Sequence, residues 1–449
     1  MSVFYKAQGL PICSTMLFPT RQEARSVPCG DLALGFCSVC GFISNVAFEA
    51  KVQSYTFPRE DTQSFSPMFS QFAQRLARDL IARYGLHDKE IIEIGCGQGE
   101  FLTLLCELGH NRGRGFDPAY LPRRGPVGAG WSTYGMDAEY GSLAGRGPSE
   151  AAGRVSFIAD YYSDKYAHYT ADLICCKMTL EHIPDVARFV RTVRGAIGDH
   201  LDTAVFFQVP DAVRILRELA FWDVYYEHCS YFSLGALGRL FQSCGFEVLD
   251  LFRAYGDQYL MLEAKPRQGP VGAGWSTYGM DAEYGSLPRR SGMDAEYGSL
   301  PRRSGVDAEY GSLPTWQPAV QVLDRWDDLA QLSHDTAQFG RSCVHRVREW
   351  RTRLQDLQKA GRRAVLWGGS SKAVAFLSTL KVGQEVEYVV DVNPHRQGTF
   401  VAGSGQQIVA PEFLRDYQPH VVILMNPIYY DEVSQELGRM GLAPDLITV

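Results

Sequence analysis

The chain has 449 residues, which is too long for one simple core, so two or three domains are expected. Its 45% apolar and 21% charged residues are typical of an ordinary folded protein, and a net charge of -7 argues against nucleic acid or an anionic membrane as a partner. No apolar run approaches the roughly 20 residues that span a bilayer.

The first residues and the cysteines indicate a compartment. The start of the chain lacks a basic region followed by an apolar stretch, so no secretory signal is expected. The 11 cysteines are an odd number for a disulfide framework, and several fall in apolar runs. This usage is typical of a reducing environment and predicts a cytoplasmic protein.

Residues 1–50 form a small module rich in Cys, Gly and Pro. Cys37 and Cys40 have the CxxC spacing of half a zinc knuckle and are followed by Gly. The other cysteines of the module, Cys13 and Cys29, stand singly rather than in a second CxxC pair. The pattern indicates a Zn²⁺ site at Cys37 and Cys40, with Cys13 and Cys29 as the remaining candidate ligands.

From residue 62 the pattern becomes that of an α/β domain. Apolar side chains at helical spacing predict a helix over 62–85. Further strands are predicted over 91–94, 113–117, 155–159, 173–176, 203–209, 246–252 and 259–264, and further helices over 100–108, 184–197 and 234–244. This alternation predicts a doubly wound, mostly parallel sheet with helices on both faces, whose last two strands form a hairpin.

An internal repeat interrupts this pattern twice. The 19-residue sequence GPVGAGWSTYGMDAEYGSL occurs at 125–143 and again, unchanged, at 269–287. The repeats carry no sustained apolar period, which a solenoid repeat needs for stacking. We expect a disordered insertion at 121–143 and a disordered linker at 267–316.

The remaining residues predict a second, smaller α/β domain. A long amphipathic helix or helix pair is expected over 319–359. Strands then follow over 364–367, 386–391 and 420–425, and helices over 372–380, 411–417 and 430–440. The predicted organisation is a Cys-rich module at 1–50, an α/β domain at 51–265 and a C-terminal domain at 317–449.

The most informative motif is the turn Gly95-Cys96-Gly97-Gln98-Gly99, which joins an apolar strand to a helix. Glycines let the backbone bend tightly and let a ligand lie against it. The acid Glu93 precedes the turn by two residues, and Asp117 ends the next strand about 20 residues later, where a carboxylate reaches a ribose diol.

These residues resemble a known family. EIGCGQGEF followed by GFDP is similar to motif I and the acidic motif of class I S-adenosylmethionine-dependent methyltransferases, and LEHIPD at 180–185 is similar to the segment after that family's fourth strand. The resemblance implies a class I methyltransferase sheet and S-adenosylmethionine as cofactor. The implied cofactor-binding residues are Glu93, Gly95, Cys96, Gly97, Gly99, Asp117 and Asp160. In this family the acid after the third strand borders the adenine, which assigns that place to Asp160. For Glu181 and His182 a structural role and a catalytic role both stay open.

Residues 222–233 are dense in ionisable and aromatic groups, and His228 lies among them. Methyl transfer to an unactivated carbon requires a base, and the unperturbed pKa of His lies nearest neutrality. The segment EHxxYFS and the domain order resemble C-methyltransferases of nucleotide-linked 4-keto deoxysugars, which have a zinc module and a C-terminal Rossmann-like domain. The resemblance implies that His228 is the base and that Glu227 assists it. Because adjacent side chains diverge, we expect Glu227 to contact substrate rather than to orient His228.

The C-terminal domain fits the same resemblance. Its turn at 365–372, VLWGGSSK, resembles the subgroup's Gly-rich turn and implies a place for the nucleotide part of the substrate. A purely structural domain remains an equal alternative.

The sequence therefore predicts C-methylation, through an enolate, of a keto sugar, either free or nucleotide-linked, or of a similar small molecule. Alternatives are an O- or N-methyltransferase of a small metabolite, and a non-catalytic binding protein inactivated by the insertion near Asp117. A nicotinamide-dependent oxidoreductase ranks last, because Gly368-Gly369 lacks a full dinucleotide fingerprint. The oligomeric state stays open.

Overall fold

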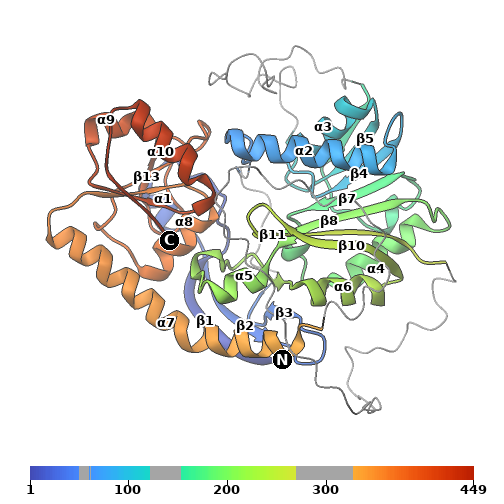
Figure 1. Cartoon of the computed structure of the whole chain (residues 1–449), viewed down its shortest axis with the longest axis horizontal. Helices are drawn as coiled ribbons and strands as arrows, with labels where there is room; N and C mark the ends of the chain where they lie inside the picture. Colours follow the sequence, from blue (N-terminus) through green and yellow to red (C-terminus); the bar gives the residue numbers. More distant parts are fainter. Residues whose placement is uncertain (50–59, 61, 122–152, 269–326) are drawn as a thin grey trace.

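The computed structural model describes residues 1–49, 60, 62–121, 153–268 and 327–449. The predicted insertion and linker lie almost wholly outside the described residues. Two α/β units lie side by side, and the N-terminal strands run along both of them (Figure 1).

The first unit is built on a seven-stranded sheet of order β10-β11-β8-β7-β4-β5-β6. Its strands are β4 (Glu90–Ile94), β5 (Arg112–Phe116), β6 (Val155–Ile158), β7 (Leu173–Lys177), β8 (Ala204–Pro210), β10 (Phe246–Ala254) and β11 (Tyr259–Pro266). The five strands β4 to β8 run parallel, and β11 is antiparallel to both of its neighbours. Central strands covered on both faces need near-continuous apolar runs, as in IIEI and LICC.

Helices cover both faces of this sheet. On one face α2 (Pro67–Tyr84) and α3 (Glu100–Gly109) pack against a cluster that includes Leu80 and Leu105. On the other face lie α4 (Val186–Ile197) and α6 (Leu234–Ser243), with Val190 and Phe241 in the core. A 6-residue helix, α5 (Ala212–Arg217), follows β8.

Local sequence explains where α2 begins and ends. Ser66 caps its N-terminus by accepting a hydrogen bond from the Phe69 amide, and Pro67 occupies the first turn, where no amide partner is needed. The helix ends at Gly85, which adopts a left-handed conformation. The helix predicted over 62–85 is therefore present but starts later, because its capping serine lies at position 66.

The second unit is a five-stranded sheet of order β14-β13-β12-β15-β16, in which every neighbouring pair is parallel. Its strands are β12 (Ala364–Trp367), β13 (Tyr388–Val390), β14 (Gln407–Val409), β15 (Val421–Leu424) and β16 (Asp445–Thr448), and its helices are α8 (Ser371–Leu380), α9 (Leu414–Tyr417) and α10 (Tyr430–Arg439). The predicted α/β class with a second Rossmann-like sheet is confirmed. The predicted helix over 411–417 begins instead as a 3₁₀ turn, Pro411–Phe413, before α9.

The long helix α7 (Leu329–Lys359) precedes the second unit. Figure 1 shows it along the lower edge of the molecule. It carries many charged side chains, and none of the helices in the described ranges has the length and apolar character that a bilayer span requires.

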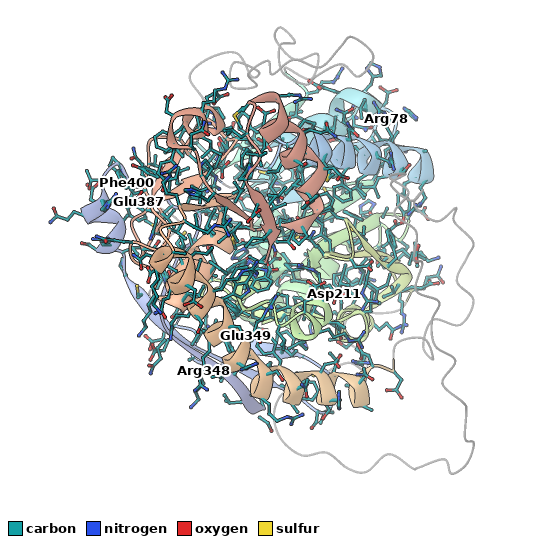
Figure 2. The ribbon with its side chains drawn as sticks, turned by 60° about the vertical axis from the view of Figure 1, so that its left-hand side comes forward. Arg78, Asp211, Arg348, Glu349, Glu387 and Phe400 are labelled. Atoms are coloured by element: carbon teal, nitrogen blue, oxygen red, sulfur yellow. The ribbon has the colours of Figure 1, made fainter. Side chains whose placement is uncertain are left out.

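The N-terminal residues form a sheet with a strand from the middle of the chain. β1 (Ser2–Pro11), β2 (Cys29–Phe36) and β3 (Ile43–Asn45) are antiparallel, and β3 also pairs with β9 (Ser230–Tyr231). A short helix, α1 (Arg21–Arg25), connects β1 and β2. An isolated bridge joins Phe18 to Phe400, which lies at the edge of the second unit beside α1 (Figure 2).

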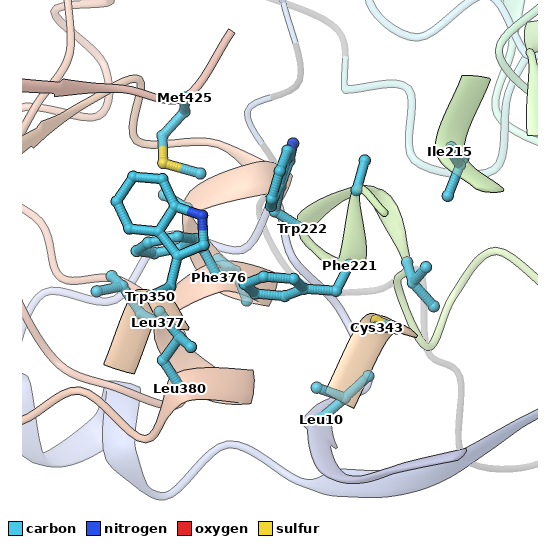
Figure 3. Packing of buried hydrophobic residues seen from close by; sticks show 14 of the residues in the cluster. Leu10, Ile215, Phe221, Trp222, Cys343, Trp350, Phe376, Leu377, Leu380 and Met425 are labelled. Carbon is cyan, nitrogen blue, oxygen red and sulfur yellow. The ribbon is translucent and has the colours of Figure 1, made fainter. Parts of the chain in front are cut away.

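One hydrophobic cluster joins the N-terminal strands to the second unit. Phe221 stacks on Phe376 of α8 with ring centroids 5.8 Å apart, and Trp350 of α7 meets the same ring edge-on at 5.3 Å. Leu10 of β1 belongs to this cluster (Figure 3). Because each buried aromatic ring contributes about 1.5–3 kcal/mol, this cluster fixes the second unit against the strands and against α5.

Candidate active site

A cavity of about 770 Å³ lies where the two α/β units meet. In an open α/β sheet, ligands bind outside the carboxyl ends of the strands, where the strand order reverses. That place lies between β4 and β7 in the first sheet and between β12 and β15 in the second. Residues after all four strands line the cavity: Gly95 to Gly97, Thr179, Gly368 and Asn426. Both binding crevices therefore open into one space.

The glycine turn after β4 adopts a conformation that other residues resist. Gly95, Gly97 and Gly99 have φ angles of 71°, 54° and 85°. A Cβ atom on Gly95 would lie 1.9 Å from the Thr179 hydroxyl oxygen, and one on Gly99 would lie 2.1 Å from the Phe157 ring. Gly95, Cys96 and Gly97 line the cavity, whereas Gly99 lies behind it at the start of α3.

Asp117, predicted to bind the ribose, also holds this turn in place. Its carboxylate accepts hydrogen bonds from the Gly97 amide at 2.9 Å and from the Ala119 amide at 2.7 Å. Asp117 follows β5, and its side chain borders the same cavity. The structure thus brings together the turn and the aspartate that the sequence paired.

Glu93 lies beneath the turn and is buried. Its carboxylate accepts a hydrogen bond from the Leu102 amide at 3.0 Å. Burial raises the pKa of Glu93 to about 7, although Lys177 opposes this shift. Loss of hydration lowers the pKa of the partly buried Lys177, and its ammonium lies 3.5 Å from the centre of the Phe101 ring. Lys177 was not among the predicted site residues, although a lysine directly after the apolar run LICC was a signal.

Asp160 follows β6 and also borders the cavity. It forms an ion pair with Lys165 and accepts a hydrogen bond from the Tyr166 hydroxyl at 2.6 Å. These two partners, Lys165 first, lower the pKa of Asp160. Its carboxylate is thus charged and held at the cavity rim, and its predicted place beside an adenine stays a prediction.

His228 lies in the cavity wall and is 8% exposed. Its ring meets those of His182 and Tyr225 nearly at right angles, with centroids 4.8 Å and 4.6 Å away. Burial, followed by the charges of His182 and Lys372, holds the pKa of His228 well below its usual value. The imidazole is therefore uncharged at neutral pH, and one of its ring nitrogens keeps a lone pair.

The N-terminal strands hold the segment that carries His228. β9 begins at Ser230 and pairs with β3, and the Asn45 amide donates to the Cys229 carbonyl at 3.0 Å. On the other side, the Glu227 carboxylate accepts from the Ser14 amide at 2.9 Å and from the Ser14 hydroxyl. Glu227 is thus tied to the N-terminal residues, and its predicted contact with substrate stays a prediction. Nothing in the sequence pointed to Ser14.

A buried ion-pair network links the two units at the cavity. Asp223 pairs with Lys372 of α8 and with Arg214 of α5 at 3.0 Å, and it accepts a hydrogen bond from Tyr225 at 2.8 Å. Although burial opposes its charged form, Lys372 and Arg214 lower the pKa of Asp223. This network places Tyr225 against His228.

Glu181 is almost completely buried next to His228. Among the described residues, neither oxygen of its carboxylate has a hydrogen-bond partner. Burial raises the pKa of Glu181 to about 8, and the nearby Glu227 adds to this shift. Donor atoms of Glu181, His182 and His228 all lie within 4.8 Å of one another.

The four N-terminal cysteines do not meet. Cys29 opens β2, whereas Cys37 follows its far end, and eight strand residues at about 3.3 Å each separate them by roughly 26 Å. Cys13 lies beyond Pro11, which is opposite Cys29. β2 therefore holds Cys13 and Cys29 at the opposite end of the sheet from Cys37, and the structure does not bring the four thiols together. Zinc at Cys37 and Cys40 alone stays a prediction.

The Gly-rich turn of the second unit faces the cavity from the other side. Gly368 has a φ of 106°, and the Gly369 amide donates to Asp391 at 2.8 Å. Arg396 is buried against this turn and donates to the Gly369 carbonyl at 3.2 Å. Lys372, at the start of α8, also lines the cavity.

Two family models match the chain. Residues 69–251 match a methyltransferase domain, and residues 317–442 match the C-methyltransferase C-terminal domain. The C-methyltransferase NovU of Streptomyces niveus is 30% identical over 187 residues, which are 41% of this chain and 39% of that protein. The chain thus aligns with well under half of that relative.

Solved methyltransferase structures also resemble part of the chain. The Burkholderia thailandensis 1,6-didemethyltoxoflavin-N1-methyltransferase, with 1,6-didemethyltoxoflavin and S-adenosylhomocysteine bound, is 18% identical and has a TM-score of 0.32. The match covers 45% of this chain and 81% of that chain. The Streptomyces davawensis N,N-8-amino-8-demethyl-D-riboflavin dimethyltransferase is 16% identical, with coverages of 44% and 56% and a TM-score of 0.30.

Proposed function

We propose that the chain methylates a carbon acceptor with S-adenosylmethionine as donor, because residues 69–251 match a methyltransferase domain and residues 317–442 match the C-methyltransferase C-terminal domain. The observation that carries the proposal is the shared cavity, because the glycine turn, His228 and the second unit's turn all border it. Two substrates can meet there without crossing bulk water, and such positioning supplies much of the rate of a bisubstrate reaction.

The residues around the first turn fit an adenosyl group. Gly95 and Gly97 present backbone without side chains to the cavity, and Asp117 places a carboxylate beside them for the ribose hydroxyls. Glu93 lies behind the turn as a second acid, and Asp160 stands at the rim for the adenine. When bound, the cofactor supplies an electrophilic methyl group.

His228 then acts as the base. A neutral ring nitrogen removes the proton from the carbon beside a carbonyl, and the electron pair of that C–H bond passes into an enolate. The enolate carbon would form the new C–C bond with the methyl group as the C–S bond breaks, and the electron pair of that bond would stay on sulfur in S-adenosylhomocysteine. The proton stays on His228. The perpendicular rings of His182 and Tyr225 keep the His228 ring in place.

The second unit supports a nucleotide-linked keto sugar as the acceptor. Lys372 and Arg396 bring positive charge to the cavity beside the N-terminus of α8, and both features suit a diphosphate. Ser370, the N-cap residue of α8, makes no side-chain capping bond. The sugar carbonyl would then face His228 across the cavity.

The test replaces the base. We expect His228→Ala to keep S-adenosylhomocysteine binding in calorimetry and to lose roughly 10²–10⁴-fold in turnover of a nucleoside-diphosphate 4-keto-6-deoxyhexose. The matched control is His200→Ala, which removes an exposed histidine from the turn before β8. Unchanged turnover in His228→Ala would remove His228 from the mechanism.

A second readout identifies the acceptor atom. In D₂O with S-adenosylhomocysteine in place of the donor, the wild-type protein should exchange the substrate's α-proton, and His228→Ala should not. Methylated product formed without any such exchange would favour the O- or N-methyltransferase alternative.

A further inference from the structure

Three potential metal ligands, none of them a cysteine, meet in the cavity wall. Glu181 and His182 belong to a 3₁₀ turn after β7, Leu180–His182, and His228 comes from the loop before β9. Their donor atoms lie within 4.8 Å of one another. Within the described ranges, this is the one group of three or more His, Cys, Asp or Glu side chains close enough to hold an ion.

Glu181 gives an independent reason to expect a cation. Its side chain is 1% exposed, and neither carboxylate oxygen has a hydrogen-bond partner among the described residues. A buried carboxyl group without partners costs several kcal/mol of transfer free energy, and native structures rarely leave one unexplained. The neighbouring Leu180 is fully buried and fixes the turn, so Glu181 cannot move to solvent cheaply.

The kind of donor selects the kind of ion. Two imidazoles and one carboxylate suit Zn²⁺ and related divalent transition metals, whereas Mg²⁺ and Ca²⁺ prefer all-oxygen sites. Metal–ligand bonds of about 2.0–2.2 Å place tetrahedral donor atoms roughly 3.3 Å apart. Side-chain rotations that bring the widest pair together by about 1.5 Å would therefore complete the site.

We propose that Glu181, His182 and His228 bind one divalent transition-metal ion such as Zn²⁺ in the cavity. The fourth position of such an ion faces the cavity, where water or an oxygen of a ligand completes the coordination.

A consequence for activity rests on the proposed function. A ring nitrogen that is bound to a metal ion has no lone pair with which to accept a proton. The ion and the deprotonation step would therefore exclude each other, and micromolar Zn²⁺ would inhibit methyl transfer by occupying His228.

Cobalt binding to the full-length protein tests the site without any substrate. We expect one Co²⁺ per chain, with visible d–d bands and without thiolate charge-transfer absorption, in a Cys37→Ser/Cys40→Ser variant that removes the other candidate pair. Glu181→Gln should weaken Co²⁺ binding at least tenfold. Glu227→Gln is the matched control, because it neutralises a neighbouring cavity carboxylate outside the cluster, and it should bind Co²⁺ like wild type.

Three results would overturn the proposal. They are equal Co²⁺ affinity in Glu181→Gln and wild type, loss of all binding in the cysteine variant, and thiolate absorption that accounts for all bound Co²⁺. If Glu181→Gln unfolds, His182→Gln serves as the second variant, because His182 is only partly buried. Since binding is read spectroscopically, failure of this site and failure of His228 as a base are separate outcomes.

Discussion

The substitution Asp117→Asn tests how the cofactor turn is held. The native carboxylate accepts two amide hydrogen bonds, from Gly97 at 2.9 Å and from Ala119 at 2.7 Å. The side-chain oxygen of asparagine can accept only one of these two hydrogen bonds. The side-chain NH₂ group would then point at the second backbone N–H, and two donors cannot form a hydrogen bond with each other. A hydrogen bond to a charged group contributes about 1.5–3 kcal/mol, so the expected loss is about 2 kcal/mol.

The structure indicates where that loss should appear. If the turn keeps its shape without ligand, the native and bound states lose the interaction equally, and the free energy of unfolding falls by about 2 kcal/mol. If the turn relaxes, binding must order it again, and the Kd of S-adenosylhomocysteine rises by up to about 30-fold. Loss of the carboxylate opposite the ribose hydroxyls adds to the second effect.

Calorimetric titration with S-adenosylhomocysteine and urea unfolding would measure both quantities. The control is Asp172→Asn, where a carboxylate oxygen likewise accepts a backbone amide, that of Glu90 at 2.9 Å, but at the opposite end of the sheet. The control should leave the Kd unchanged. Changes below about 0.5 kcal/mol in both quantities for Asp117→Asn would refute the reasoning.

Three further predictions concern stability. Gly95→Ala would add a Cβ atom 1.9 Å from a threonine oxygen at a residue with positive φ, so urea unfolding should show a free energy of unfolding lower by about 2–4 kcal/mol. The control Gly198→Ala also has a positive φ, but its Cβ atom would meet open space, and it should lose about 1–2 kcal/mol. Equal losses in the two variants would contradict this reasoning. Lys372→Met removes one partner of the buried Asp223 and should lower the free energy of unfolding by about 3 kcal/mol. Lys359→Met removes one partner of an exposed ion pair and should lower it by less than about 0.5 kcal/mol. A small loss in both variants would show that the buried ion pair does not stabilise the fold. Burial raises the pKa of Glu93 to about 7 from its ordinary value of 4.5, so between these pH values the folded chain keeps a proton that the unfolded chain has lost. The free energy of unfolding should therefore fall as pH rises from about 4.5 to 7. Unfolding curves at several pH values should show this fall in wild type and not in Glu93→Gln, and parallel trends would contradict it.

The sequence predicted those parts of the fold that local pattern determines. Apolar runs such as those at 91–94 and 173–176 became central strands, because burial on both faces requires such runs. The strands β14 and β16 were missed. They are three and four residues long, partly exposed and set among loops, so no periodicity marks them.

In the site, too, the residues that could be predicted are close together in the sequence, and those that could not are far apart. Glu93, Gly97 and Asp117 were found because a strand, a turn and the next strand place them together within 25 residues of sequence. The bond between Ser14 and Glu227 spans 213 positions, and no local pattern encodes it. The distance between the N-terminal cysteines could not be predicted for a related reason, because spacing in sequence does not reveal that a whole strand separates Cys29 from Cys37.

The pairing of β3 with β9 has a consequence for how the protein acquires its chemistry. The two strands are nearly 190 positions apart, and contacts of such high sequence separation are entropically costly to form early in folding. Each α/β unit can build its own parallel sheet from much nearer neighbours. The loop that carries His228 is therefore expected to be among the last features to reach its final shape, and a chain whose two parallel sheets are already complete can still have His228 out of place in the cavity wall.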